Sequence, residues 1–440
     1  MQYYSTNHKI KPVSLSEAVI KGLAPDNGLF MPEKICSFSD EYFENIHTLS
    51  FREIALDVAL KFFGEDIGQE KLKELVYDTL SFDCPVVKIY SDIWSLELFH
   101  GPTLAFKDVG ARFMARLLRH FLRENKRMVN VLVATSGDTG SAVANGFLGI
   151  EGIRVFVLYP RGKVSEIQEK QFTTLGQNIV ALEIDGTFDD CQHLVKSAFL
   201  DSSLNDKMML TSANSINVAR FLPQAFYYFN AYARLREKGA LKDKELIFAV
   251  PSGNFGNLTA GLIAREMGLP VKRFLAANNE NDVVYEYLKT GIYQPRPSVE
   301  TIANAMDVGT PSNFARILDL YGDSYDRISG ILKGYRYSDQ EIREMIRTVF
   351  NETGYMTDPH GACGIAALRE NLCSQETGVF LETAHPAKFR DTMETILQVK
   401  NMEIPQKLKA FLKGNREFVS LPADYAEFRD KLLSYNQMPN

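Results

Sequence analysis

One lysine, Lys107, stands among apolar and small residues in the stretch HGPTLAFKDVG at positions 100–110. An exposed lysine needs no such neighbours, whereas an amine that is partly removed from water has a lowered pKa. A neutral amine is a nucleophile that can form an imine with a carbonyl group. A lysine whose hydrocarbon stem lies along apolar surface while its ammonium stays in water is the alternative interpretation, and Lys107 taken alone favours it.

Two other stretches share nearly the same five letters, SGDTG at 136–140 and SGNFG at 252–256. Each follows an apolar run and precedes a helix-like one, so each reads as a glycine-rich turn between a strand and a helix. Such turns expose consecutive backbone N–H groups at the positive end of a helix dipole, which favours an anion. A tight helix entry with polar caps would explain either loop alone. The repetition favours two anion sites.

The two loops differ in charge. Asp138 would repel a phosphate beside it, whereas Asn254 is neutral and can donate a hydrogen bond. We therefore assign a phosphate to the second loop, with Asn257 as a further donor, and a carboxylate to the first. The donors to that carboxylate would be backbone N–H groups together with the hydroxyls of Thr135, Ser136 and Thr139.

A reactive lysine and a phosphate site together predict a cofactor. Pyridoxal 5′-phosphate carries an aldehyde for a lysine, a dianion for a glycine-rich helix N-terminus, and a ring that accepts electrons. Neither loop has the G-K-[ST] of a P-loop or the pattern G-x-G-x-x-G, so nucleotide binding is poorly supported. No histidine or cysteine spacing matches a zinc motif and no G-x-S-x-G is present, so we expect neither a metal nor an α/β hydrolase.

The elements that would hold these residues alternate between strand and helix patterns, which predicts βαβ units and a parallel sheet covered on both faces. Residues 1–80 instead show helical spacing, with Ser14 and Glu17 as a capping box. We expect an N-terminal domain at 1–80, an α/β catalytic region of two subdomains at 81–400 and a C-terminal extension at 401–440. The strand-like runs are 129–135, 154–160, 178–185, 245–250, 271–278 and 378–383.

Length and composition describe an ordinary globular protein. The chain has 440 residues and a net charge of −6 without a long basic run, which argues against nucleic acid as a partner. Five widely spaced cysteines predict no disulfide framework and favour a reducing compartment. Because the sequence shows neither a signal peptide nor a membrane-spanning apolar run, we expect a cytoplasmic protein that does not bind membranes. A monomer and a homodimer both fit.

Several segments resemble signatures of the threonine synthase family, which belongs to the tryptophan-synthase-like pyridoxal phosphate enzymes. The prelude STNHKIKPVSLSEAVIKGLAPDNGLFMPE also resembles the N-terminal domain of that family. The resemblance covers nearly the whole chain, with one departure at Asn257, where several relatives carry Asp. It implies the type II fold of these enzymes: two parallel-sheet α/β domains with the cofactor cleft between them, plus a mainly helical N-terminal domain. The segments are, in order, HGPTLAFKDVGARF, ATSGDTGSAVA, LYPRGKVSEIQEKQF, TSANSINVAR, VPSGNFGNLTAG, NAMDVGTPSN and TAHPAKF.

The resemblance also implies roles for individual residues. Lys107 would form the Schiff base, and Thr383 in LETAHPAKF would meet the pyridine nitrogen. The implied reaction is the last step of threonine biosynthesis: γ-elimination and β-addition convert O-phospho-L-homoserine and water to L-threonine and phosphate. The freed Lys107 amine would take the Cα proton. Without the resemblance, Thr383 is a β-branched residue that ends a buried strand. The implied phosphate cradle consists of Gly253, Asn254, Phe255 and Gly256.

The substrate of that reaction brings a second phosphate. Each residue considered for it is more simply explained, taken alone, as an exposed or capping residue. The nearest rival function is a dehydratase or β-replacement synthase with the same fold and cofactor. A binding module without activity and a nicotinamide oxidoreductase are more distant rivals. The residues considered for the substrate phosphate are Arg112, Arg161, Lys163, Asn214, Ser215 and Asn217.

Overall fold

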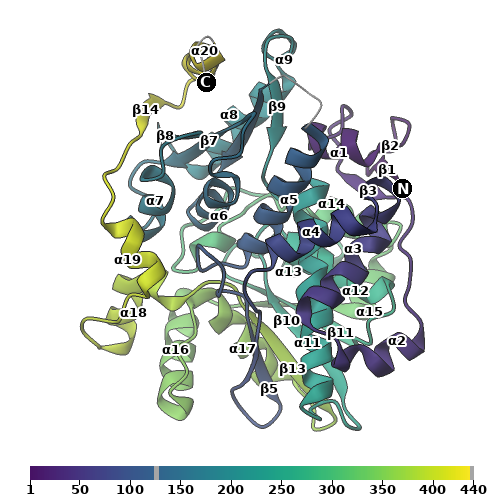
Figure 1. Cartoon of the computed structure of the whole chain (residues 1–440). Coiled ribbons are helices and arrows are strands. Elements are labelled where there is room, and N and C mark those ends of the chain that lie inside the picture. Colours follow the sequence, from purple (N-terminus) through teal and green to yellow (C-terminus); the bar gives the residue numbers. More distant parts are fainter. Residues whose placement is uncertain (123–127, 437–440) are drawn as a thin grey trace.

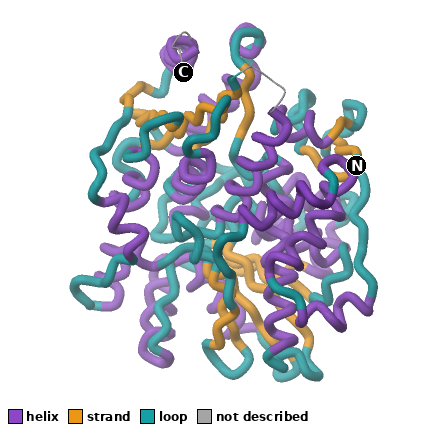
Figure 2. The backbone as a smooth tube through the Cα atoms, viewed as in Figure 1, coloured by secondary structure: helices purple, strands orange, loops and turns teal. Residues whose placement is uncertain are grey.

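The structure is a computed structural model that describes residues 1–122 and 128–436. Two larger sheets lie one above the other, with helices between and around them, and a small third sheet lies beside them near the N-terminus (Figures 1 and 2). The predicted α/β class with two parallel-sheet regions is confirmed. Within the described ranges, no helix is long and apolar enough to cross a membrane.

The N-terminal region combines helices with a small antiparallel sheet of order β2-β1-β3. Sequence patterns predicted a mainly helical region, because strands of two to four residues leave too little alternation to detect. Half of the predicted capping box is present: the Ser14 hydroxyl accepts a hydrogen bond from the Glu17 N–H at 3.2 Å, whereas the Glu17 carboxylate pairs with Lys21 instead of the cap backbone. The elements are β1 (Gln2–Ser5), β2 (Val13–Ser14), α1 (Leu15–Lys21), β3 (Phe30–Pro32), α2 (Asp40–Asn45), α3 (Phe51–Ile67) and α4 (Gln69–Thr79).

The larger sheet has six strands in the order β12-β11-β10-β13-β5-β4. All neighbours are parallel except β4, which is antiparallel to β5. Helix α17 packs against β10, β11 and β13. The bounds are β4 (Val86–Lys88), β5 (Ile93–Glu97), β10 (Glu245–Pro251), β11 (Arg273–Asn278), β12 (Leu332–Arg336), β13 (Glu376–Glu382) and α17 (Pro359–Asn371).

The smaller sheet has five parallel strands in the order β14-β8-β7-β6-β9. Both faces of its central strands are covered, which explains why β6 and β7 are apolar along most of their length. In β6, Val131 and Val133 join the core that contains α6 (Asp138–Phe147), whereas Leu132 and Ala134 belong to the same cluster as Leu194 of α8 (Phe188–Leu200). The bounds are β6 (Val129–Ala134), β7 (Ile153–Pro160), β8 (Ile179–Asp185), β9 (Met209–Ser212) and β14 (Val419–Pro422).

The C-terminal segment does not form a separate unit. It runs along one side of the molecule, yellow in Figure 1, and its strand β14 pairs with β8 at the edge of the smaller sheet. The sequence predicted only an extension here and not the strand, whose side chains are half-buried or exposed. The elements after β13 other than β14 are a 3-10 helix (Pro386–Phe389), α18 (Arg390–Leu397), α19 (Gln406–Leu412) and α20 (Tyr425–Asn436).

The remaining helices connect the strands of the two larger sheets. All five cysteines are free, in line with the expected absence of a disulfide framework. The bounds are α5 (Lys107–Leu122), α6 (Asp138–Phe147), α7 (Glu166–Thr173), α8 (Phe188–Leu200), α9 (Ser202–Asn205), α10 (Val218–Phe221), α11 (Ala225–Glu237), α12 (Gly256–Glu266), α13 (Val283–Thr290), α14 (Phe314–Leu320), α15 (Tyr325–Ile331) and α16 (Asp339–Thr353).

Candidate active site

A cavity lies where strands from both larger sheets end. Its walls come from the segments that follow β5, β6, β9, β10 and β13, in agreement with the rule that ligands bind beyond the carboxyl ends of parallel strands. Lys107 and the loop 253–256 face this same cavity, although they are far apart in the sequence. The predicted site residues that line it are Lys107, Thr135, Ser136, Thr139, Asn214, Ser215, Gly253, Asn254, Phe255, Gly256, Asn257 and Thr383.

Lys107 is the first residue of α5, and hydrogen bonds fix the backbone on both sides of it. The Phe106 N–H donates to the Thr383 carbonyl at 2.9 Å, which ties the start of α5 to the end of β13. The N–H and the hydroxyl of Thr103 donate to the Asp108 carboxylate at 2.9 and 2.7 Å. The lysine is therefore held beside Thr383, the residue predicted to meet the cofactor ring.

The environment of Lys107 makes its amine easier to deprotonate. Burial lowers the pKa of Lys107 from 10.5 to about 8. The carboxylate of Asp138 opposes this change, whereas the positive charges of Arg220 and Lys388 lower the pKa further. The direction agrees with the sequence-based expectation, and it leaves a useful fraction of the amine neutral near physiological pH.

The loop after β10 has the backbone shape of an anion cradle. Phe255 adopts a left-handed conformation, with a φ of 61°, immediately before α12 begins at Gly256. A Cβ on Gly253 would lie 2.7 Å from the Met306 Cα, so this position has no room for a side chain. Backbone N–H groups at the start of α12 can therefore approach an oxyanion closely.

Two asparagines give this loop its shape. The Asn257 Nδ2 donates to the Pro251 carbonyl at 2.8 Å, and its Oδ1 accepts from the Ser252 hydroxyl. The Asn254 Oδ1 accepts from the Ser312 N–H at 3.1 Å. The prediction made Asn257 a donor to a phosphate, but the structure uses its side chain to fix the turn. Any donation from Asn257 to an anion would come from its backbone N–H.

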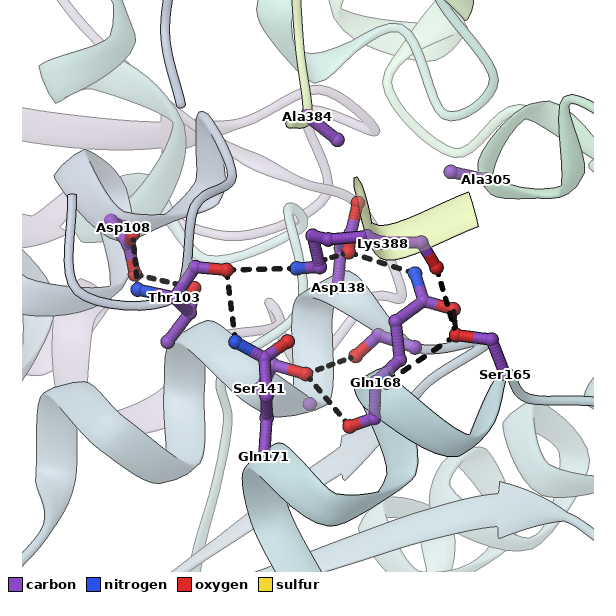
Figure 3. A network of polar contacts seen from close by, with 12 residues as sticks. Thr103, Asp108, Asp138, Ser141, Ser165, Gln168, Gln171, Ala305, Ala384 and Lys388 are labelled. Atoms are coloured by element: carbon purple, nitrogen blue, oxygen red, sulfur yellow. Dashed lines mark hydrogen bonds and ion pairs between the residues drawn. The ribbon is translucent and has the colours of Figure 1, made fainter. Parts of the chain in front are cut away.

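The loop after β6 is built differently. The Thr135 hydroxyl accepts hydrogen bonds from the N–H groups of Gly137 and Gly140 at 2.9 and 2.8 Å, so it shapes the loop. Of the first N–H groups of α6, those of Gly140 and Ser141 are bonded within the loop, and those of Asp138 and Thr139 are left for a ligand. Asp138 does not line the cavity. Its carboxylate forms a buried ion pair with the Lys388 Nζ at 2.6 Å (Figure 3).

The three cations considered for the substrate phosphate lie elsewhere. Arg112 donates to main-chain carbonyls at the end of α4. Arg161 pairs with Glu183 at 3.0 Å, and Lys163 pairs with Glu300 at 2.9 Å. None of the three lines the cavity, which corrects the expectation that they bind substrate in this conformation. Their place in family-like segments gave no information on side-chain direction.

The polar residues of TSANSINVAR divide into two groups. Asn214 and Ser215 line the cavity, and Asn214 also bonds to both backbone groups of Ala134 at the end of β6. Asn217 does not line the cavity: it caps α10 and donates to the Val19 carbonyl at 3.0 Å. Asn217 therefore joins the N-terminal region to the site without facing it.

Sequence analysis missed several residues of the cavity wall, and Arg220 is the most informative of them. It is only 4% exposed, and burial lowers its pKa from 12.5 to about 10. The signal was present, because Arg220 follows Asn217 by three residues in the same motif. Arginine is mostly exposed in proteins, so the residue type gave no reason to place it inside. The other missed polar residues are Gln224, Asn304, Asp307 and His360.

These observations fit pyridoxal 5′-phosphate. One cavity brings together a lysine of lowered pKa, a cradle without side chains that suits a phosphate, and the Thr383 hydroxyl, which can bond to a ring nitrogen. Within residues 1–122 and 128–436, no group of three or more His, Cys, Asp and Glu side chains is placed to hold a metal ion.

Comparison with known proteins gives the class and then the family. Residues 85–381 match the family model described as pyridoxal-phosphate dependent enzyme, which is the class that the fold and the cavity define. Residues 2–80 match the threonine synthase N terminus, and residues 361–431 match the threonine synthase C-terminal model. The chain belongs to the threonine synthase family.

Individual relatives match over nearly their whole length. The threonine synthase of Escherichia coli strain K12 is 43% identical, with 99% of this chain and 100% of that protein covered. The Escherichia coli crystal structure superposes with a TM-score of 0.93, at 42% identity over 99% of this chain and all of that one. A structure described as PLP-bound threonine synthase from Brucella melitensis has a TM-score of 0.92, at 33% identity with both chains fully covered.

Replacing Gly253 with alanine should weaken cofactor binding, because the new Cβ would meet backbone at Met306 that cannot move aside cheaply. We expect a loss of about 1–3 kcal/mol, as for other overpacked sites. Titration of the purified protein with pyridoxal 5′-phosphate, followed by visible absorbance, measures it. Gly330→Ala is the matched control, since no atom lies within 4 Å of its Cβ. Equal affinity of both variants would contradict the cradle.

The lowered pKa of Lys107 should be visible in its reactivity. In the cofactor-free protein, acylation of Lys107 should follow the neutral amine and reach half its maximal rate near pH 8. In the same protein unfolded by urea, the midpoint should move up toward the ordinary lysine value of 10.5. Mass spectrometry of the modified peptide measures both rates. A folded-state midpoint at the unfolded value would show that burial does not affect this amine.

Proposed function

We propose that this chain is a carbon–oxygen lyase that converts O-phospho-L-homoserine and water to L-threonine and phosphate with pyridoxal 5′-phosphate as cofactor. The observation that carries the proposal is a single cavity with Lys107, one anion cradle at 253–257 and a separate cation, Arg220. A substrate that brings its own phosphate needs such a second site. Membership of the threonine synthase family supports the same reaction.

The residues proposed to hold the cofactor are Lys107, the backbone of 253–257 and the Thr383 hydroxyl. When bound, pyridoxal 5′-phosphate supplies an aldehyde for the substrate amine and a ring that withdraws electrons from Cα. A hydroxyl beside the ring nitrogen accepts or donates a hydrogen bond, and it does not force that nitrogen to be protonated as a carboxylate would. With Thr383 as its partner, the ring nitrogen can therefore stay unprotonated, whereas an acidic partner would keep it protonated.

Lys107 is the base of the proposed mechanism. Its amine takes the proton from the substrate Cα, gives that proton up, and is then free to take one from Cβ, and the electron pair left at Cβ expels the phosphate from Cγ. Water then adds at Cβ, and the protons return. A base works best when its pKa is near the working pH, and the burial that lowers the pKa of Lys107 to about 8 meets this condition.

The two ends of the substrate would meet different parts of the wall. The N–H groups at the start of α6, with the hydroxyls of Ser136 and Thr139, suit the carboxylate, since they are neutral donors at the positive end of a helix. The guanidinium of Arg220, with Asn214 and Ser215 beside it in the wall, suits the phosphate. These donors replace Arg112, Arg161 and Lys163 in the proposal.

The domain boundaries expected from the sequence stay part of the proposal. They are 1–80 for an N-terminal domain, 81–400 for the catalytic region and 401–440 for the extension. The family models at 2–80 and 85–381 support the first boundary. The five free cysteines support a reducing compartment, which fits work in the cytoplasm.

A product assay tests the function. The purified protein with pyridoxal 5′-phosphate should release L-threonine and phosphate from O-phospho-L-homoserine in equal amounts. Lys107→Ala should lower kcat by at least about a hundredfold, because the base is lost. A dehydratase or β-replacement synthase would instead give a keto acid or need a second nucleophile. Release of phosphate without threonine would rule out the proposed reaction.

Arg220 should contribute to substrate binding, whereas Arg161 should not. Arg220→Met should lower kcat/KM for O-phospho-L-homoserine by roughly thirtyfold or more, since a buried charge partner of the substrate phosphate is lost. Arg161→Met removes the same charge from a half-exposed residue outside the cavity and should leave kcat/KM within about twofold. Steady-state kinetics compares the two variants. A larger loss in Arg161→Met would restore the sequence-based assignment.

A further inference from the structure

A buried ion pair joins the two larger sheets behind the cavity. Lys388 belongs to the 3-10 helix that follows Thr383, and Asp138 is the first residue of α6. Their side chains are 0% and 3% exposed, and the Lys388 Nζ lies 2.6 Å from the Asp138 Oδ1. The mechanism proposed above uses the side chain of neither residue, so the pair needs a separate explanation.

Lys388 also contacts the segment that leads to Lys107. Its Nζ donates to the Thr103 carbonyl at 2.9 Å, and the Gln171 Nε2 donates to the same carbonyl at 3.0 Å. Thr103 in turn binds Asp108, the residue next to Lys107. Figure 3 shows the ammonium of Lys388 between Thr103 and Asp138. One cation therefore holds the loop before α5 and the start of α6 at a fixed separation.

The smaller sheet supports the other side of this network. The Gln168 Nε2 donates to the Asp138 Oδ1 at 2.8 Å. The Ser165 hydroxyl lies 3.0 Å from the Gln168 Oε1 and 3.1 Å from the Lys388 carbonyl (Figure 3). All four side chains are thus oriented by hydrogen bonds across the boundary between the two sheets.

Stability alone does not explain such a pair. A buried ion pair is costly to desolvate, and replacing both partners with apolar residues is often neutral or stabilising. Its charges have a clearer consequence for ligand binding. Asp138 begins the helix whose N–H groups are proposed to bind the substrate carboxylate, and an uncompensated anion there would repel that group.

The charges already act on each other in the structure. Burial would raise the pKa of Asp138, but the charges of Lys388 and Lys107 lower it below its usual range, so the carboxylate is ionised. The pKa of Lys107 responds to the same two groups with opposite signs: Asp138 raises it and Lys388 lowers it. The pair therefore presents nearly no net charge to the cavity.

We propose that Lys388 is a positioning residue that neutralises Asp138 and fixes the 136–140 loop against Lys107, so that this loop can accept the substrate carboxylate. The inference rests on the proposed function, because it takes the substrate to be an amino acid with a carboxylate at this loop. If the pair only held the two segments together, removing either charge would have the same effect on ligand binding. Under this proposal, removal of the positive charge should weaken carboxylate binding and removal of the negative charge should not.

The test compares two single variants of the holoenzyme that break the same contact. Lys388→Met leaves the anion and should weaken carboxylate binding by at least tenfold. Asp138→Asn leaves the cation and should keep that binding unchanged or tighten it. Lys388→Met with Asp138→Asn removes both charges and should return binding to within about threefold of the original protein. Lys409→Met, at an exposed position of α19, is the matched control and should change nothing.

The probes are the phosphonate isostere of O-phospho-L-homoserine, which cannot release phosphate, and the same compound without its carboxylate. Inhibition constants for both are measured, together with cofactor absorbance. Lys388→Met should lose affinity for the first probe and keep affinity for the second within about threefold. If Lys388→Met does not fold, Lys388→Gln and the double variant replace it, and both still separate charge from shape.

If Lys388→Met and Asp138→Asn lose affinity equally for both probes, the inference is overturned, and the pair only holds the two segments together. The same holds if Lys388→Met binds the two probes as the original protein does. Failure of the original protein to make threonine would instead reject the proposed function, which the product assay reads separately. The two failures are therefore distinguishable.

Discussion

The site depends on the partial removal of one amine from water, since Lys107 is half-buried. Lys107 lies at the start of a helix between two sheets, and burial is the largest cause of its lowered pKa. Taking a lysine amine out of water costs free energy, so the backbone around it must be held in place by other contacts. The hydrogen bonds from Phe106 to Thr383 and from Thr103 to Asp108 supply that support. The remaining parts of the cavity are arranged around this amine.

The two glycine-rich loops show how similar sequences acquire different tasks. Around 253–256, a left-handed Phe255 and the absence of a side chain at Gly253 open the backbone to an anion with no charged residue in the loop. Around 136–140, the loop contains a carboxylate, which turns into the protein and meets a lysine from the other sheet. One loop avoids a charge, and the other cancels it. The loop with Asp138 therefore depends on Lys388, which lies outside both loops, to neutralise its charge. The loop with Asn254 needs no such partner.

The sequence predicted the parts of the fold and site that depend on local patterns. Long apolar strands such as 153–160 and both glycine loops were found, because β-branched runs and glycine-rich turns are local signals. The short strands β5, β9 and β14 were missed, since their pairing with distant strands is what makes them strands. The positions of several side chains were missed for the same reason, because they depend on contacts between residues that are far apart in the sequence. Arg220 and Lys388 are buried, and Arg161 pairs with Glu183 of the neighbouring strand β8, and none of these positions is signalled by the residues next to them in the sequence. Thr383 was assigned only through a family resemblance.

Strand order also has a consequence for how the protein is made. The ribosome releases residues in sequence, so β5 and Lys107 emerge long before β13, which lies beside β5 in the finished sheet. The edge strand β14 emerges later still and completes the other sheet. A nascent chain therefore carries its reactive lysine through most of translation without the walls that lower its pKa. Cofactor capture must follow synthesis of nearly the entire polypeptide, which makes it a late marker of correct folding.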